Sequence, residues 1–205
     1  SDVCSSDLRM NYMASIEEKV EDLYKKVLSD IGLRPFTKTE KINESIDNAL
    51  KTANSKSGGN GNNYPDIKCL LDNKHGRTIP VMIEAKGTKG RLEKRSKEGD
   101  IIGVTLTKDG KPNNTAVQNF AVNGALHYGN AILDYSTYEE VIIIGINGSA
   151  ADTAGNVIDP EYAAYYVSEK NHRVPKPIDK LDAKWSLFKP SMVSELYTIL
   201  DDMNL

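Results

Sequence analysis

Residues 64–87 read YPDIKCLLDNKHGRTIPVMIEAKG and have the pattern of two short strands joined by a turn. The first strand is expected at residues 67–71 and the second at 79–84, with the turn-forming DNKHG at residues 72–76 between them. The apolar run IPVMI in the second strand predicts burial inside a sheet. We therefore expect the fold to be organised around this hairpin.

Three charged side chains stand at the ends of these strands. Asp66 directly precedes the first strand, and Glu84 and Lys86 lie two residues apart at the end of the second. Side chains two apart on a strand share a face, and pairing of the strands would bring Asp66 near them. Two carboxylates beside an ammonium suit a hard divalent cation next to a phosphodiester, because oxygens bind the metal and the ammonium steadies an attacking water.

The arrangement resembles the PD-(D/E)XK nuclease signature, with Pro65-Asp66 as the PD and Glu84-Ala85-Lys86 as the (D/E)XK. The tripeptide alone is weakly specific, because the same pattern occurs at residues 17–19, 66–68, 72–74, 109–111 and 182–184. Among these, only Glu84 ends a long apolar run and follows a proline–aspartate pair across a turn. The alternative interpretation is an ordinary hairpin with a surface glutamate and lysine at its end.

This resemblance implies a Mg²⁺-dependent DNA endonuclease in which Asp66, Glu84 and the Ala85 carbonyl bind the metal. Lys86 would orient the water, and in-line attack on phosphorus would leave 5′-phosphate ends. The competing hypothesis is a catalytically inactive nuclease-fold module for DNA binding or scaffolding. Retention of Asp66, Glu84 and Lys86 together argues against that alternative.

Two further residues are accessory candidates through the resemblance. In PD-(D/E)XK proteins a first-helix glutamate can join the metal site, which points to Glu17, with Glu21 next; a solvated helix face is the alternative. Some of these nucleases carry a glutamine on a later helix within a Q-x-x-x-Y pattern. Gln118 matches the glutamine, but Val122 stands in place of the tyrosine. A structural glutamine bonded to nearby backbone is the other interpretation.

A wider resemblance joins IPVMIEAKGTKG to the downstream segments NFAVNGALHYGNAIL and VIIIGING. It is to the amino-terminal nuclease regions of type IIG-like restriction-modification polypeptides, which carry a DNA methyltransferase on the same chain. This implies DNA as the substrate, a role in phage defence, and methyltransferase and target-recognition domains on a longer chain. Dimerisation would be one way to pair two sites for double-strand cleavage.

Composition bounds these hypotheses. The chain has 205 residues, of which 27% are charged and 39% apolar, as expected of a globular domain without a membrane span. The net charge of −3 argues against DNA binding by bulk electrostatics, so contacts must come from a local patch. Such a patch is the cationic segment 87–97, with a solvated loop as the alternative. The expected DNA-backbone contacts are Lys89, Arg91, Lys94 and Arg95.

The cysteines and histidines indicate neither a disulfide framework nor a zinc site. There are two cysteines, Cys4 and Cys69, and the three histidines have no ligand-like spacing. A reducing, cytoplasmic setting is therefore expected.

The whole chain predicts an α/β fold, a restriction-endonuclease-like three-layer core with a central mixed β-sheet flanked by helices in the order α-β-β-β-α-β. We expect residues 1–13 to be a leader, non-native or disordered, and residues 14–150 to form the nuclease core. Residues 151–205 would be an extension with an added strand and a terminal helix that leads to further domains. Helices are expected at 15–31, 42–53, 116–133 and 192–200, and further strands at 33–37, 101–106, 141–146 and 161–167.

Two more expectations concern loops and surfaces. The glycine-rich residues 55–63 lack the ending of a nucleotide-binding loop and are expected to be a flexible entry to the Asp66 strand that touches the DNA backbone. The polar residues of the predicted helix 116–133 are expected to form a solvated stripe, made of Asn119, Asn123, His127 and Asn130.

Overall fold

The computed structural model describes residues 13–72 and 75–205. The expected leader lies outside the described residues except for Met13, as do Asn73 and Lys74 of the expected turn. In the described part of the chain, no helix is long and apolar enough to cross a membrane.

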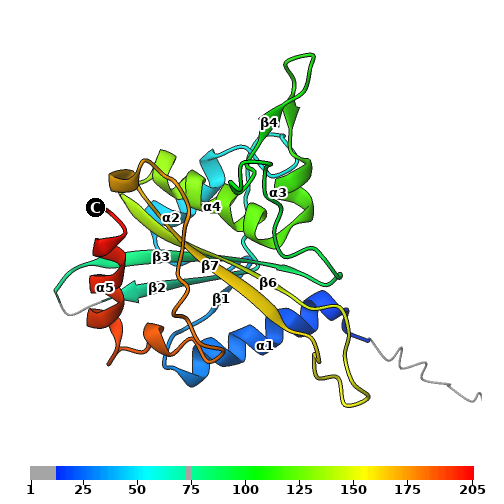
Figure 1. Cartoon of the computed structure of the whole chain (residues 1–205), viewed down its shortest axis with the longest axis vertical. Helices are drawn as coiled ribbons and strands as arrows, with labels where there is room; N and C mark the ends of the chain where they lie inside the picture. The colour runs from blue at the N-terminus through cyan, green and yellow to red at the C-terminus, as the bar shows by residue number, and fades with distance from the viewer. Residues whose placement is uncertain (1–12, 73–74) are drawn as a thin grey trace, which may run out of the picture.

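A six-stranded mixed sheet forms the centre of the molecule (Figure 1). Its strand order is β1-β2-β3-β6-β7-β8, in which β3 and β6 run parallel and every other neighbouring pair runs antiparallel. The strands are β1 (Phe36–Thr37), β2 (Ile67–Asp72), β3 (Thr78–Lys86), β6 (Glu140–Asn147), β7 (Glu161–Ser168) and β8 (Lys176–Pro177). The parallel pair at the centre is buried on both faces, which explains the continuous apolar runs of β3 and β6.

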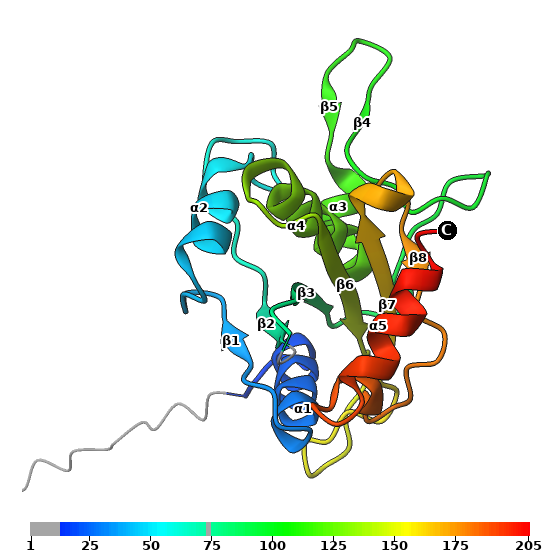
Figure 2. The same cartoon turned by 90° about the vertical axis from the view of Figure 1, so that its left-hand side faces the viewer.

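Helices cover both faces of this sheet (Figure 2). One face packs against α1 (Ile16–Asp30), α5 (Val193–Asp202) and the 3₁₀ turn η2 (Ser186–Phe188). The other packs against α2 (Glu44–Thr52) and α4 (Ala121–Tyr135). The remaining elements are the short helix α3 (Thr115–Asn119), the 3₁₀ turn η1 (Glu169–Asn171), and a projecting hairpin of β4 (Thr105–Leu106) and β5 (Pro112–Asn113).

The expected fold class is confirmed. The order α1-β1-β2-β3-α4-β6 follows the predicted α-β-β-β-α-β core, with α2 inserted before β2 and the β4–β5 hairpin and α3 inserted before α4. Period-two alternation sets the faces of β3: Val81, Ile83 and Ala85 pack with α1, whereas Met82 packs with α4. Glu84 continues the Met82 face.

The start of α1 and its end also agree with the sequence. Ser15 accepts a hydrogen bond from the backbone N–H of Glu18, and the Glu18 side chain bonds back to the Ser15 N–H. This capping box satisfies two of the amides that a helix start leaves unpaired. The helix closes before Gly32, whose φ of +87° lies in the left-handed region.

The predicted single helix at residues 116–133 is wrong, because it is two helices separated by Phe120. Phe120 has extended backbone angles, φ −124° and ψ 140°. The chain breaks here because the loop after β3 supplies acceptors for the first amides of α4: Ala121 N–H donates to Arg91 O at 2.9 Å and Val122 N–H to Leu92 O at 2.8 Å. The strand expected at residues 101–106 is likewise reduced to Thr105–Leu106.

The predicted solvated stripe is also wrong at Asn123, which is fully buried. Its amide donates to Lys94 O at 2.9 Å and to Ile102 O at 2.7 Å, and its oxygen accepts from Lys94 N–H at 2.9 Å. Asn119, from the same predicted stripe, is exposed. Asn123 therefore fastens the 94–102 loop to α4.

Asn123→Ala should destabilise the fold by about 2–3 kcal/mol, because it leaves buried backbone groups of the loop without partners. Urea unfolding followed by circular dichroism measures this change. Asn119→Ala is the matched control and should shift the free energy of unfolding by less than about 0.5 kcal/mol. Equal effects of the two substitutions would contradict the clamp.

Candidate active site

Asp66 and Glu84 lie side by side because of the β2–β3 register. Ile67 pairs with Ile83, which places Asp66 next to the end of β3. Asp66 is 4% exposed, and its Oδ2 accepts a hydrogen bond from the Ala85 N–H at 2.7 Å. The bond ties the start of one strand to the end of the other, so the two carboxylates are held on a rigid part of the sheet.

Glu84 is buried, and only one of its two carboxylate oxygens has polar partners among the described residues. The residue is 3% exposed, so the alternative of a surface glutamate at the end of a hairpin is wrong. Lys56 contacts Oε1, and Lys86 Nζ lies 3.7 Å from the same oxygen. Oε2 is buried and finds no hydrogen-bond partner among residues 13–72 and 75–205. A buried carboxylate oxygen without a donor is the kind of group that a bound cation would satisfy.

The first helix contributes two more carboxylates. Ligand oxygens of Glu17, Glu21 and Asp66 lie within 4.8 Å of one another. Glu17 and Glu21 are one helical turn apart and so share a face of α1. The chain passes close to α1 at Gly87, where a Cβ would lie 2.5 Å from the Glu17 backbone nitrogen. A residue with a side chain at this position would push α1 away from the end of β3.

Lys38 offsets part of the charge of this acidic cluster. Its Nζ lies 2.9 Å from Asp66 Oδ1 and 3.7 Å from Glu21 Oε1. Burial lowers the pKa of Lys38, but the hydrogen bond and the charge of Asp66 outweigh that effect, so the pKa is raised and the ammonium is retained. Burial and the charge of Asp66 together raise the pKa of Glu21.

The pKa of Glu84 is raised to about 7. Burial is the largest cause and the charge of Asp66 the next, and together they exceed the opposing effects of Lys56 and Lys86. The phenol of Tyr128 on α4 faces the same region, and burial with the nearby charges of Glu84 and Asp66 raises its pKa. Its hydroxyl donates to the Tyr64 carbonyl at 3.4 Å.

A pocket of about 480 Å³ opens over these groups. The predicted site residues Asp66, Glu84 and Lys86 line it, together with both accessory candidates, Glu17 and Gln118. Ala85 adjoins it through its bond to Asp66.

Gln118 reaches the pocket from α3 as an exposed residue, rather than from the apolar face of a long helix as its predicted position implied. The pocket also contains Lys38, Lys56 and Tyr128, which the sequence did not single out.

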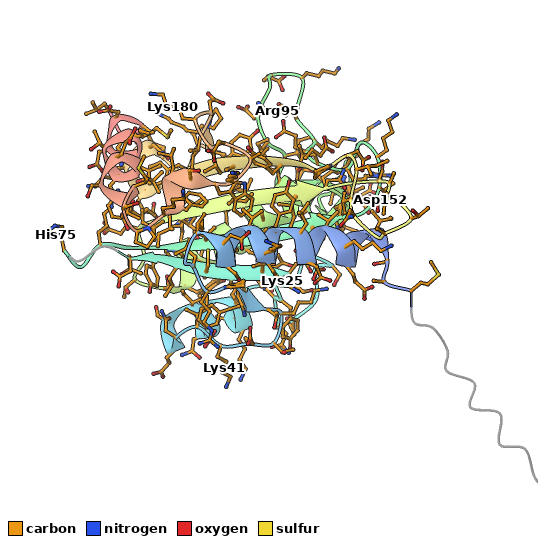
Figure 3. All side chains as sticks on the ribbon, turned by 90° about the horizontal axis from the view of Figure 1, so that it is seen from below. Lys25, Lys41, His75, Arg95, Asp152 and Lys180 are labelled. Atoms are coloured by element: carbon orange, nitrogen blue, oxygen red, sulfur yellow. The ribbon has the colours of Figure 1, made fainter. Side chains whose placement is uncertain are left out.

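Three of the four predicted DNA-contacting residues are exposed to solvent or lie over an aromatic ring. Lys89 is exposed, and Arg91 and Lys94 lie over the Phe120 ring at 5.0 and 5.6 Å from its centroid. Arg95 differs: it pairs with Glu93 at 3.0 Å and bonds the Tyr165 hydroxyl on β7 at 2.5 Å. Figure 3 shows Arg95 on the opposite side of the molecule from Lys41, which lies three residues before the first residue of α2.

The buried Glu84 should make stability fall as pH rises. The unfolded glutamate loses its proton near pH 4.5, whereas the folded one keeps it to about pH 7, so the folded state binds more protons between these values. Glu84→Gln removes this pH dependence. As pH rises from 5 to 8, the free energy of unfolding of the variant relative to that of wild type should increase by about 2–3 kcal/mol. Urea unfolding in EDTA at both pH values measures the difference.

Glu195→Gln on the exposed face of α5 is the matched control for this measurement. Its pH profile should run parallel to that of wild type. A Glu84→Gln profile that is also parallel would show that Glu84 titrates as in the unfolded chain.

Comparisons with known proteins agree with a restriction-enzyme-like relationship. No family model matches the chain, and no solved structure matches it. Over 190 residues, 91% of this chain, it is 25% identical to the "Type II restriction enzyme and methyltransferase RM.BcgI" of Heyndrickxia coagulans. The chain spans 25% of the length of that relative. The similarity is distant, and it supports a nuclease-related role for the domain built around Asp66 and Glu84.

Proposed function

We propose that this chain is a PD-(D/E)XK nuclease domain, the Mg²⁺-dependent DNA-cleaving part of a restriction-modification enzyme. The observation that carries the proposal is the meeting of Asp66, Glu84 and Lys86 around one pocket, with a buried Glu84 oxygen that lacks a partner among the described residues. The relative is both a restriction enzyme and a methyltransferase, which supports DNA as the substrate.

The donor set fits a hard divalent cation. Asp66, Glu84 and the Ala85 carbonyl would hold Mg²⁺, and the acidic cluster extends the set to Glu17 and Glu21. Mg²⁺ would polarise the scissile phosphate and make the attacking water more acidic. Every donor in this set is an oxygen, as Mg²⁺ requires.

The protein's own groups would place the reactants. Lys86 ends a rigid strand, and its ammonium would orient the water and offset negative charge as it builds on phosphorus. Its Nζ lies 3.7 Å from Glu84 Oε1, so electrostatic positioning is the role we assign to it. Water would attack phosphorus in line with the 3′ oxygen, forming a new P–O bond as the P–O3′ bond breaks. The attacking water would release a proton to solvent and the 3′ oxygen would take one from solvent, which leaves a 5′-phosphate and a 3′-hydroxyl.

The longer-chain context is part of the same proposal. Residues 14–150 would form the nuclease core and residues 151–205 the extension toward methyltransferase and target-recognition domains on one chain. The match to a quarter of a restriction enzyme and methyltransferase supports this arrangement. A second copy of the chain would supply the second site needed to cut both strands.

A second candidate function is a DNA-binding module without catalysis. One observation favours it: the ammonium groups of Lys38 and Lys56 lie on Asp66 and Glu84, where a cation would bind. Titration of Mn²⁺ by calorimetry into wild type and Glu84→Gln separates the two functions. A nuclease site should bind the ion and lose affinity in the variant, whereas an inactive module should show no binding in either protein.

Asp66→Asn or Lys86→Ala should lower Mg²⁺-dependent nicking of supercoiled plasmid by about 10²–10⁴-fold, because each removes a group that acts directly on the reacting phosphate or water. Gel assays in Mg²⁺ and in EDTA measure this, with circular dichroism to establish that the fold is intact. The control for Lys86→Ala is Lys184→Ala, which lies in another tripeptide of the same pattern and should cut normally. Wild-type rates in either site variant would refute the assignment.

Replacing Lys89, Arg91 and Lys94 with Gln should weaken DNA binding equally for all sequences and lower the salt slope by about 2.7, since each lost phosphate contact removes about 0.9. Fluorescence anisotropy in Ca²⁺ between 50 and 200 mM salt, a range that separates such slopes, measures both quantities. The control carries the same charge change on exposed residues of the C-terminal segment: Lys180, Lys184 and Lys189. An equal loss in the control would show that only net charge matters.

A further inference from the structure

Lys56 reaches the pocket from a tight turn in the glycine-rich loop. Gly58 N–H donates to Ser55 O at 2.9 Å, so Lys56 occupies the second position of a four-residue turn. Gly58 ends this turn at φ +86°. The turn directs the Lys56 side chain inward, where it contacts Glu84 and is 20% exposed.

The two ends of this loop are fixed, and its exposed tip is held by the Ser55 N–H, which donates to Gly59 O at 3.0 Å, and by contact of Gly58 with the Asn114 side chain. Asn63 is buried, and its amide donates to the carbonyls of Leu50, Ala53 and Asn54 at 3.0–3.1 Å. His127 on α4 bonds the Asn54 carbonyl at 2.8 Å. Residues 57–60 are exposed between these anchors. A movement of Lys56 would therefore break contacts of this exposed tip rather than those of α2 or β2.

Lys56 differs in this respect from the other two lysines of the pocket. Lys86 belongs to β3. The backbone around Lys38 is held by the buried Lys68, whose Nζ donates to Glu40 O at 2.6 Å and to Lys38 O at 3.4 Å. In the position where it contacts Glu84, the Lys56 Nζ also lies 5.1 Å from the centroid of the Tyr128 ring. Among the three, Lys56 is the one in the glycine-rich loop, whereas Lys86 lies in a strand and the Lys38 carbonyl accepts a hydrogen bond from Lys68.

The charge of the pocket changes sign when a divalent ion is added. Three carboxylates and three ammonium groups line the pocket, and Glu21 adjoins it through Lys38. When all are ionised they leave one negative charge: Glu17, Asp66, Glu84, Lys38, Lys56, Lys86 and the adjoining Glu21. One divalent cation would turn this into one positive charge, which matches a phosphodiester. An ammonium that leaves Glu84 at that point gains a phosphate partner in place of the carboxylate.

We propose that Lys56 is a second functional lysine of the site, which neutralises Glu84 in the metal-free protein and binds a DNA phosphate once Glu84 binds a cation. This inference rests on the proposed nuclease function. Lys56 must leave Glu84 Oε1 before both oxygens of that carboxylate are open to a cation. Lys56 therefore opposes metal binding and favours DNA binding, two effects of opposite sign that no purely structural tether would produce.

Lys56→Met keeps the length of the side chain and removes its charge. Mn²⁺ titration by calorimetry, without DNA, should show binding that is tighter than wild type by about tenfold or more, because the cation no longer has to displace an ammonium from Glu84 Oε1. In a Glu84→Gln background the same substitution should give no gain. Lys180→Met, exposed on the C-terminal segment, is the matched control and should leave Mn²⁺ affinity unchanged.

DNA binding supplies the opposite half of the test. In Ca²⁺, Lys56→Met should weaken binding of a duplex about tenfold relative to Lys180→Met, and Lys56→Arg should restore most of it. Thermal unfolding of Lys56→Met by circular dichroism establishes that the protein is folded in both measurements.

Two outcomes would overturn the inference and are distinguishable. Equal Mn²⁺ affinity in wild type and Lys56→Met, with binding present in both, would overturn the role of Lys56 alone. Absence of Mn²⁺ binding in both proteins would overturn the nuclease proposal and this inference with it. Weaker Mn²⁺ binding in Lys56→Met would show that Lys56 supports the ligands rather than competing with the cation.

Discussion

The burial of two carboxylates at one end of the β2–β3 pair is the constraint on which the rest of the site depends. Removing Asp66 and Glu84 from water is strongly unfavourable unless hydrogen bonds and opposite charges compensate. The Ala85 N–H, Lys38 and Lys56 provide that compensation from three different segments. Apolar residues would fill this space at a lower cost in free energy, so stability alone does not account for the burial of the acidic pair.

The parts of this arrangement that follow from local rules could be predicted from the sequence. Alternation along the hairpin and the proline–aspartate pair were sufficient to place Asp66 beside Glu84. In a hairpin, the position of a residue in the sequence determines which residue of the partner strand lies next to it. The capping box of α1 was equally local. The position of Glu17 could be ranked but not fixed, since it depends on how α1 approaches Gly87.

The features that could not be predicted are those in which one segment completes the hydrogen bonds of another. The break at Phe120 exists because carbonyls of residues 91–92 replace intrahelical acceptors. The helical periodicity of residues 116–133 does not indicate these acceptors, because they belong to a distant loop. Asn123 has the spacing of a surface residue, yet it is buried by a loop whose path is not encoded nearby. Lys38 and Lys56 are similar cases, because a lysine in a polar loop gives no local sign of which distant carboxylate it meets.

The acidic cluster also depends on the far end of the chain. Glu17 and Glu21 reach Asp66 only if α1 keeps its rotation, and that rotation is set by Tyr24 one turn further along, whose ring stacks on Trp185 at 5.0 Å. Trp185 is fully buried and also meets Phe188 edge to face, with ring centroids 6.0 Å apart. The segment after β7 therefore belongs to the same packed layer as α1 and helps to aim its carboxylates. Because interiors of this density do not deform gradually, a change at Trp185 would be transmitted to the carboxylates through α1 as a rigid body.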